Sequence, residues 1–117
     1  MTDWDDNLPI YQQLRLLVVR RILAGSLEEG EALPSIRQVA ADMRVNPLTV
    51  SKAYQLLVDE ALIHKQRGLG MYVSSGARQR ALAAERERFL QDEWPPLRER
   101  IAELGLDLDD LMVGDDS

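Results

Sequence analysis

The stretch from Ser35 to Val58 reads SIRQVAADMRVNPLTVSKAYQLLV and predicts two short helices joined by a tight turn. Ser35 and Gln38 have the spacing of a capping box, in which serine accepts a backbone N–H and glutamine reaches back to the cap. Asn46 followed by Pro47 is typical of a second helix start, with proline at the first helical position. The turn falls at Arg44-Val45, and the second helix is expected to run to about residue 60.

Both predicted helices carry apolar side chains at helical spacing, so each has one face to bury. The inward residues are Ile36, Val39, Ala40 and Met43 in the first, and Val50, Ala53, Tyr54, Leu57 and Val58 in the second. Tyr54 is therefore expected in the core.

A longer helix is predicted before this pair, from Pro9 to Gly25, because proline suits a first turn and glycine a helix end. Its apolar face comprises Ile10, Leu14, Leu17, Val18 and Ile22. Residues 26–34 are expected to form a loop, in which Ala32 and Leu33 could make a very short strand.

A hairpin is predicted after the pair, with strands over Leu62–Gln66 and Met71–Ser74. Arg67-Gly68-Leu69-Gly70 supplies the turn, with two residues free to take positive φ. Three helices followed by a hairpin form a winged helix-turn-helix, expected over residues 1–75. The predicted fold class is thus mostly α with a small β-hairpin.

Residues 76–117 form a second predicted region, helical and rich in Ala, Arg, Glu and Leu from Ala77 to about Glu93. Trp94-Pro95-Pro96 is expected to break this helix, because proline disfavours helical geometry at the residue before it. A second apolar stripe follows up to Gly105, a predicted helix cap, and Asp107 is expected to start a last turn.

In a helix-turn-helix the second helix enters the major groove of DNA, with its N-terminal residues against base edges. Asn46 and Thr49 hold those positions, with Ser51 and Lys52 one turn on. The first helix start, with Ser35 and Arg37, suits a phosphate. Ser35 and Asn46 are helix caps first, and in isolation Arg37 and Lys52 fit a solvated surface equally well.

The net charge of −6 opposes nucleic-acid binding, but its distribution does not. Residues 1–75 hold 8 basic and 9 acidic residues, a net of −1, and residues 76–117 hold 6 and 11, a net of −5. Residues 34–75 hold 5 basic and 3 acidic residues, a net of +2. Positive charge is therefore concentrated at the predicted helix-turn-helix and hairpin.

Six segments in this order carry a resemblance to a known family. They are Pro9-Ile-Tyr-Gln-Gln-Leu14, Gly25-x-Leu-x-x-Gly30, Leu33-Pro-Ser-Ile-Arg-Gln-Val-Ala40, Val45-Asn-Pro-x-Thr-Val50, Ala53-Tyr54-x-x-Leu57 and Arg67-Gly-x-Gly70-x-x-Val73. Together they resemble the DNA-binding domain of the GntR family of bacterial transcriptional regulators, across about residues 9–74.

The resemblance implies that the arginine after Leu-Pro-Ser, the first turn of the third helix and the hairpin turn contact operator DNA. The residues expected to bind DNA are Ser35, Arg37, Asn46, Leu48, Thr49, Ser51, Lys52, Lys65, Arg67 and Gly68. Pro47 and Leu48 occupy positions where some members carry longer polar side chains, so fewer base contacts are expected here.

The remaining region is too short for the effector-binding domains of most GntR branches and resembles the YtrA-type branch, whose C-terminal helices serve dimerisation. Its apolar stripe exceeds what two lone helices bury within one subunit. The residues expected at a dimer interface are Leu82, Phe89, Leu90, Leu97, Ile101 and Leu104. The alternative is that these helices fold back on their own winged helix. The resemblance implies a homodimeric repressor on an inverted-repeat operator.

Two positions depart from the family pattern. Arg44 and Ala61 stand where its members usually have glycine, in the turn between the two helices and at the end of the second. We predict that both take positive φ at a cost of about 1 kcal/mol each. Asp59 and Glu60 lie unfavourably at the negative end of the helix dipole, which predicts a less rigid helix exit.

Other function classes find little support in the residues. There is no cysteine, the single histidine is His64 on a predicted strand, and Gly68-x-Gly70 lacks the third glycine of a dinucleotide site. We therefore expect no enzyme activity, metal or cofactor, no membrane association, and a cytoplasmic location; no effector can be named. The remaining alternative is a winged helix for protein contacts, with the acidic C-terminal region as its surface.

Overall fold

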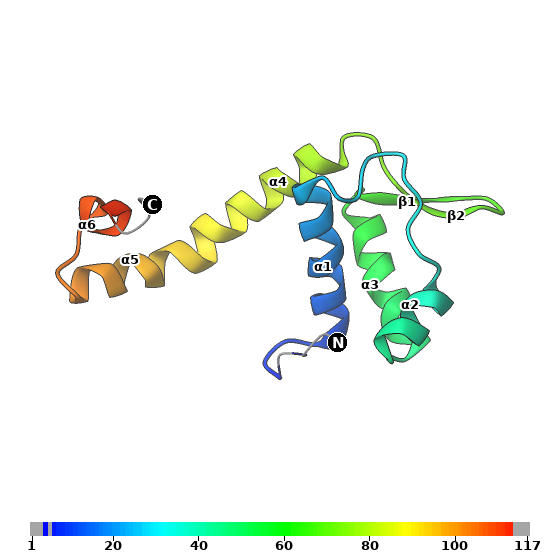
Figure 1. Ribbon diagram of the computed structural model, residues 1–117, viewed down its shortest axis with the longest axis horizontal. Helices are drawn as coiled ribbons and strands as arrows, with labels where there is room; N and C mark the ends of the chain where they lie inside the picture. The colour runs from blue at the N-terminus through cyan, green and yellow to red at the C-terminus, as the bar shows by residue number, and fades with distance from the viewer. Residues whose placement is uncertain (1–3, 5, 114–117) are drawn as a thin grey trace. The chain divides into compact units, whose positions relative to one another are not determined.

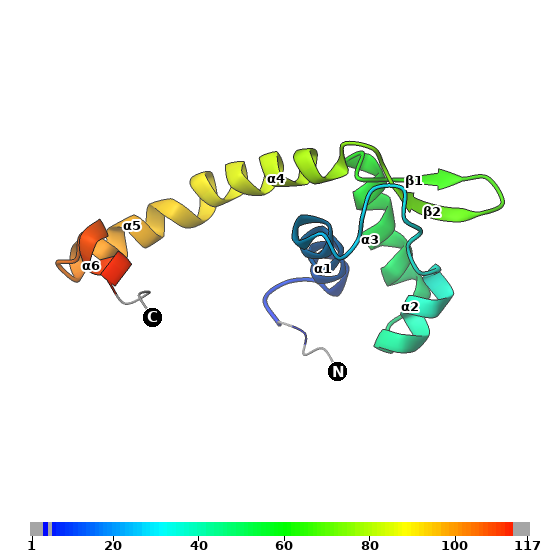
Figure 2. The ribbon, with the colours of Figure 1, turned by 45° about the horizontal axis from the view of Figure 1, so that its top comes forward.

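The computed structural model describes Trp4 and residues 6–113, and the described residues form a mostly helical chain with one two-stranded hairpin (Figures 1 and 2). The predicted fold class is confirmed. The contacts divide the chain into two compact units, Met1–Leu82 and Ala83–Ser117, each described below by itself.

The first unit is a winged helix-turn-helix. Its elements are α1 (Ile10–Ala24), α2 (Ile36–Met43), α3 (Pro47–Asp59), β1 (Ile63–Gln66), β2 (Gly70–Val73) and the start of α4 (Ala77–Arg88). Helix α3 packs against both α1 and α2, and the hairpin follows α3 directly (Figure 1).

The core of this unit lies between α1, α3 and the hairpin. Its largest fully buried side chains are Val19, Ile22, Val50, Leu57, Ile63 and Val73. The predicted inner face of α1 was partly wrong: Val19 is fully buried, Leu17 and Val18 are half-buried, and Ile10 is exposed. Leu17 and Val18 instead line a shallow apolar hollow of about 280 Å³ shared with α2 and α3.

Local caps set the helix boundaries as the sequence predicts, with one exception. Ser35 Oγ accepts the Gln38 N–H at 3.0 Å, and Asn46 Oδ1 accepts the Leu48 N–H at 2.8 Å. The Gln38 side chain does not reach back to the cap, however. Its amide donates to the carboxylate of Asp42, one turn further on, at 2.9 and 3.0 Å. Only half of the predicted capping box forms.

The first strand of the hairpin starts one residue later than predicted and the second lies one residue earlier, with Ile63 opposite Val73 and Gln66 opposite Gly70. Its turn uses both glycines, Gly68 at φ 77° and Gly70 at φ 105°. Ala32 forms an isolated bridge with Tyr72, and the neighbouring Leu33 N–H donates to the Met71 carbonyl at 2.8 Å. The strand expected at Ala32-Leu33 is reduced to this single bridge at the edge of the hairpin.

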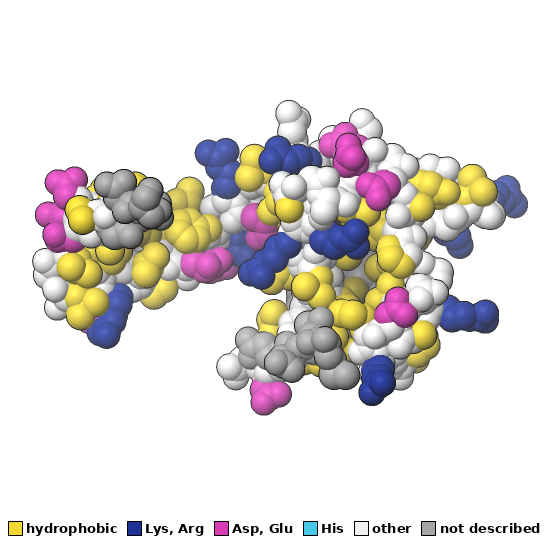
Figure 3. All heavy atoms as spheres, viewed as in Figure 1, with side chains coloured by type: hydrophobic (Ala, Val, Ile, Leu, Met, Phe, Trp, Pro, Cys, Tyr) yellow, Lys and Arg dark blue, Asp and Glu magenta, His cyan; other side chains and the backbone are white. Residues whose placement is uncertain are grey.

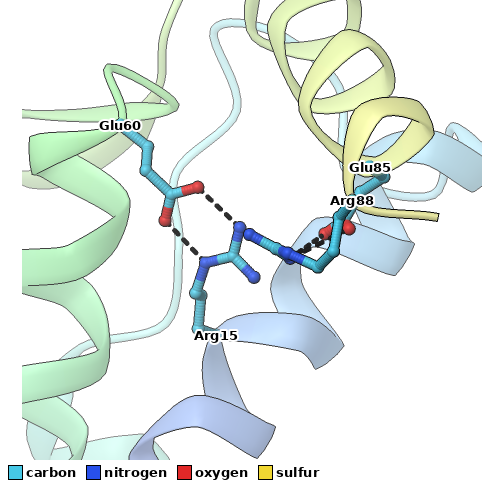
Figure 4. A network of polar contacts seen from close by, with 4 residues as sticks. All are labelled: Arg15, Glu60, Glu85 and Arg88. Atoms are coloured by element: carbon cyan, nitrogen blue, oxygen red, sulfur yellow. Dashed lines mark hydrogen bonds and ion pairs between the residues drawn. The ribbon is translucent and has the colours of Figure 1, made fainter. Parts of the chain in front are cut away.

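An ion pair joins α1 to the end of α3. Arg15 is buried, and its Nε and Nη2 donate to the two carboxylate oxygens of Glu60 at 2.6 and 2.5 Å (Figure 4). Such a two-pronged pair is geometrically specific. Glu60 does lie at the C-terminal end of α3, as expected, but its carboxylate has a buried cationic partner that offsets the unfavourable helix dipole.

Hydrogen bonds between side chains and backbone groups hold the first turn of α4 to the rest of the first unit. Glu29 accepts the N–H groups of Gly76 at 2.9 Å and Arg78 at 3.3 Å, which lowers the pKa of this carboxyl. Arg80 donates to the Ala61 carbonyl at 2.7 and 3.1 Å and to the Ser75 carbonyl at 2.6 Å. The guanidinium fits because residue 76 is glycine: a Cβ there would lie 2.7 Å from Arg80 Nη1.

Ala77 and Ala81 are fully buried, so the first compact unit extends past the hairpin into α4. The predicted boundary at residues 75 and 76 marks the start of α4 but not the end of this packing.

The second unit is a helix that continues through the two prolines. The end of α4 is followed by a π-helical turn, η1 (Phe89–Glu93), then by α5 (Trp94–Glu103) and α6 (Leu108–Val113). The predicted break at Trp94-Pro95-Pro96 is wrong. Proline has no N–H to donate, and both prolines fall in the first turn of α5. The Trp94 N–H bonds to the Phe89 carbonyl, the i→i+5 bond of a π-turn.

Short polar and aromatic contacts stabilise this unit. The rings of Phe89 and Trp94 stack at 6.5 Å, and Arg88 pairs with Glu85 at 2.9 Å (Figure 4). Gly105 follows α5 at φ 69°, as predicted for a helix cap. Asp107 and Asp110 exchange side-chain and backbone hydrogen bonds of 2.9 Å at the start of α6, where the last turn was predicted.

The two predicted positive-φ residues are confirmed. Arg44 has φ 57° at the end of α2, and Ala61 has φ 61° just after α3. Both are in the left-handed region, where a side chain carries a steric cost that glycine avoids.

We therefore expect Arg44→Gly and Ala61→Gly each to raise the free energy of unfolding by about 1 kcal/mol, or a few degrees in Tm. The matched control is Ala41→Gly on the exposed face of α2, which should lower stability by about the same amount. Thermal unfolding by circular dichroism at one protein concentration measures all three. If Arg44→Gly and Ala61→Gly both lower the free energy of unfolding, the backbone strain assigned to these two positions is wrong.

Candidate nucleic-acid interface

Helix α3 has one buried and one exposed face, and the exposed face begins at its N-terminus. Val50, Ala53, Tyr54 and Leu57 point into the core. On the other side Leu48 has 76% of its surface exposed, and Ser51 and Gln55 are also exposed. Thr49 is half-buried. This exposed face therefore carries one apolar side chain, Leu48, followed by two uncharged polar ones, Ser51 and Gln55.

A groove of about 460 Å³ runs between this face, the start of α2 and the hairpin. Figures 1 and 2 show the hairpin extending away from the end of α3. The groove brings together three of the residues predicted to bind DNA, Ser35, Ser51 and Lys65. Gln55 and Met71 share its lining, together with Leu69 from the hairpin turn.

The hairpin turn supplies the outer wall of the site. Arg67 and Gly68 are exposed there, and Leu69 has 68% of its surface exposed. Figure 3 shows basic side chains projecting from the hairpin and from the side of the molecule that carries α2. Arg37 is exposed in the first turn of α2. The cations predicted to meet phosphates are thus accessible, but they are few.

Three of the predicted residues are engaged within the protein. Ser35 Oγ is occupied by the cap of α2. Asn46 Oδ1 is occupied by the cap of α3. The ammonium of Lys52 lies 4.1 Å from the centroid of the Tyr11 ring on α1, a cation–π contact. Lys52 does not line the groove, so the structure places it apart from Ser35, Ser51 and Lys65.

The groove keeps its shape through Tyr54, which ties α3 to the start of α2. The phenol is buried, and its hydroxyl donates to the Pro34 carbonyl at 2.7 Å. Burial raises the pKa of Tyr54 to about 12, so the hydroxyl stays protonated and can donate at neutral pH. Its expected place in the core is confirmed.

Gln55 was not among the residues predicted to contact DNA. It lies four residues after Ser51 on α3, so helical spacing places the two on one face, and this signal could have identified it. Its amide donates to Asp59 at 2.9 Å in the structure.

The residues predicted for dimerisation lie along α4, η1 and α5. Leu82, Phe89, Leu90, Leu97 and Leu104 are exposed, and Ile101 is half-buried. Leu108, Met112 and Val113 of α6 are also exposed. The second unit therefore carries more apolar surface than it buries by itself.

Among the described residues, no three His, Cys, Asp or Glu side chains gather to hold a metal ion. None of the helices in that part of the chain has the length and apolar character needed to cross a membrane. His64 Nδ1 lies 2.8 Å from Ser74 Oγ on the exposed hairpin.

Comparison with known proteins identifies similar chains. Residues 10–73 match the family described as bacterial regulatory proteins, gntR family. The transcriptional repressor YtrA of Bacillus subtilis is 41% identical over 72 residues, which are 62% of this chain and 55% of that protein. The chain thus matches little more than half the length of that repressor.

Solved structures are similar over more of the chain. A GntR family transcriptional regulator from Listeria monocytogenes is 26% identical with a TM-score of 0.76, covering 97% of this chain and 100% of that one. YtrA from Sulfolobus acidocaldarius, a GntR-family transcription factor, is 38% identical with a TM-score of 0.61, covering 77% and 95%. The likeness to the Listeria regulator includes the C-terminal helices.

We expect Tyr54→Phe to lower the free energy of unfolding by about 1 kcal/mol at neutral pH, because the Pro34 carbonyl loses its donor. Since the pKa of Tyr54 is raised above its ordinary value of 10.0, its contribution is full below pH 10 and declines as the pH rises towards 12. The gap between wild type and variant should narrow over that range in urea unfolding. Equal stability at neutral pH would contradict the role assigned to this bond.

Proposed function

The chain belongs to the gntR family of bacterial regulatory proteins, which are DNA-binding transcriptional regulators and not enzymes, and from this we propose that it represses transcription as a homodimer on an inverted-repeat operator. The observation that carries the proposal is the groove between α3 and the hairpin, which gathers Ser35, Ser51 and Lys65.

In the proposed complex α3 lies in the major groove of double-stranded DNA, with its N-terminal turns against the bases. Ser51 and Gln55 then face base edges, where a hydroxyl and an amide can each donate or accept hydrogen bonds. The cations beside the DNA major groove then bind phosphates. They are Lys65 and Arg67 on the hairpin and Arg37 at the start of α2. The phosphate contacts give affinity, and the α3 contacts give sequence preference.

A homodimer follows from the apolar surface of the second unit. Phe89, Leu90, Leu97 and Leu104 are exposed at intervals of about two helical turns, and burying apolar area is favourable by about 25 cal/mol per Å². A second copy offers the same stripe and can cover it about a two-fold axis. Two recognition helices related by such an axis require half-sites about one helical turn of DNA apart.

Repression is proposed because a dimer bound across a promoter excludes polymerase without needing further contacts. The B. subtilis relative is named a repressor. A regulator with this role works beside the bacterial chromosome, so the proposed location is the cytoplasm. The proposal requires no cofactor and leaves any small-molecule effector unassigned.

A second candidate function is a protein-binding winged helix. It is favoured by the net charge of −5 on residues 76–117 against −1 on residues 1–75. The two candidates differ in their salt dependence, since DNA binding weakens steeply as counterions are released. Binding that is insensitive to salt would favour the protein-partner function.

We expect Arg37→Ala to weaken binding about a hundredfold to every duplex tested, as for loss of one charged hydrogen bond in each subunit of the dimer. The slope of log K against log salt should become shallower by about 1.8, or about 0.9 for each of the two phosphates. Fluorescence anisotropy on fragments of the chain's own promoter region measures both. Arg20→Ala, an exposed arginine on α1, is the charge-matched control and should leave both unchanged.

Ser51→Ala should instead change the ranking of operator variants while leaving the salt slope unaltered, because a base contact carries no counterion release. An unchanged salt slope in Arg37→Ala would contradict the phosphate contact.

For the dimer, we expect the double variant Leu90→Glu, Leu97→Glu to shift the protein from dimer to monomer, because two buried charges per subunit oppose association. Sedimentation velocity measures the mass, and operator affinity should fall with it. Leu69→Glu, equally exposed on the hairpin, should remain dimeric. A wild-type monomer at micromolar concentration would contradict the proposed dimer and favour helices that fold back on their own subunit.

A further inference from the structure

Leu48 is an exposed apolar residue at the place where a DNA-reading helix meets the bases. It lies in the first turn of α3, and 76% of its surface is exposed. Its backbone N–H is held by Asn46 Oδ1 at 2.8 Å, so the cap sets the position of this turn. The protein buries too little of the Leu48 side chain for core packing to explain a leucine at this position.

The neighbouring side chains leave Leu48 as the main outward group of the first turn. Asn46 uses its side-chain oxygen in the cap, and Thr49 is half-buried. Lys52, one turn on, lies over the Tyr11 ring on α1. Asn46 and Lys52 are therefore engaged within the protein, and Leu48 is more exposed than Thr49.

The major groove presents a single apolar feature on the base edges, the C5-methyl group of thymine. A branched alkyl side chain cannot satisfy the donors and acceptors of the other base edges, and it leaves them desolvated at a cost. We propose that Leu48 is a specificity-determining residue that packs against a thymine methyl in each half-site. This inference rests on the proposed function and adds to it one base pair of the operator.

The size of the effect follows from the chemistry. Burying one methyl-sized group is worth about 0.8 kcal/mol, which corresponds to about a fourfold change in affinity. Replacing thymine by deoxyuridine removes only that methyl and keeps every hydrogen-bonding group of the base pair. A two-fold dimer contacting two methyls should show about a fifteenfold loss when both are removed.

The test uses the full-length protein and a duplex that it selects from a random library. Each thymine of one half-site is replaced in turn by deoxyuridine, and the affinity is measured by anisotropy. Wild type should lose about fourfold at one or two adjacent positions and nothing elsewhere. Leu48→Ala should bind the thymine and deoxyuridine duplexes equally, and Leu48→Val should retain part of the difference.

Two controls separate this contact from other causes. Leu8→Ala removes the same side chain from an exposed position outside the proposed DNA site and should leave the deoxyuridine penalty intact. At the sensitive position a 5-methylcytosine pair should bind more tightly than the cytosine pair, because the methyl returns to the same place in the groove.

The inference is overturned if wild type is insensitive to deoxyuridine at every thymine, or if Leu48→Ala keeps the full penalty. Either result leaves selection of a duplex, and hence the proposed function, standing. If the protein selects no duplex from the library, the proposed operator binding and this inference both fail.

Discussion

The rest of the structure depends on the burial of one face of α3. Val50 and Leu57 are fully buried against α1 and the hairpin, which fixes the rotation of the helix about its own axis. Because α-helical positions repeat every 3.6 residues, that rotation also determines which side chains face outward. Leu48, Ser51 and Gln55 are therefore exposed by packing that none of them takes part in.

The ends of α3 and the hairpin are held by a few polar contacts. Arg15 and Glu60 tie the end of α3 to α1, while Arg80 binds the carbonyls of Ala61 and Ser75, which follow α3 and β2. Gly76 leaves space for that guanidinium. The two elements of the proposed DNA site are thus anchored at one point, the first turn of α4.

Features that depend on neighbouring residues were predictable from the sequence, and features that join distant residues were not. The caps at Ser35 and Asn46, the glycine turn of the hairpin, and the positive φ of Arg44 and Ala61 all follow from local backbone chemistry. The Arg15–Glu60 pair spans 45 residues, and the Glu29–Gly76 hydrogen bond spans 47. No spacing rule links such positions before the fold brings them together.

The contact of Lys52 with Tyr11 could not be predicted for the same reason, because it depends on how α1 packs beside α3. The error in the second unit has a local cause instead. The two prolines predicted a break because proline disrupts a regular α-helix. The chain instead widens one turn, and the hydrogen bond from Trp94 to Phe89 carries the helix past them.

That widened turn also sets the direction of the side chains that follow it. A π-turn holds one residue more than the α-turn it replaces. Losing one residue between Phe89 and Glu93 would turn Leu97, Ile101 and Leu104 by about 100° relative to Arg88. A deletion of one residue would therefore reorient this exposed stripe without altering any residue of the winged helix-turn-helix.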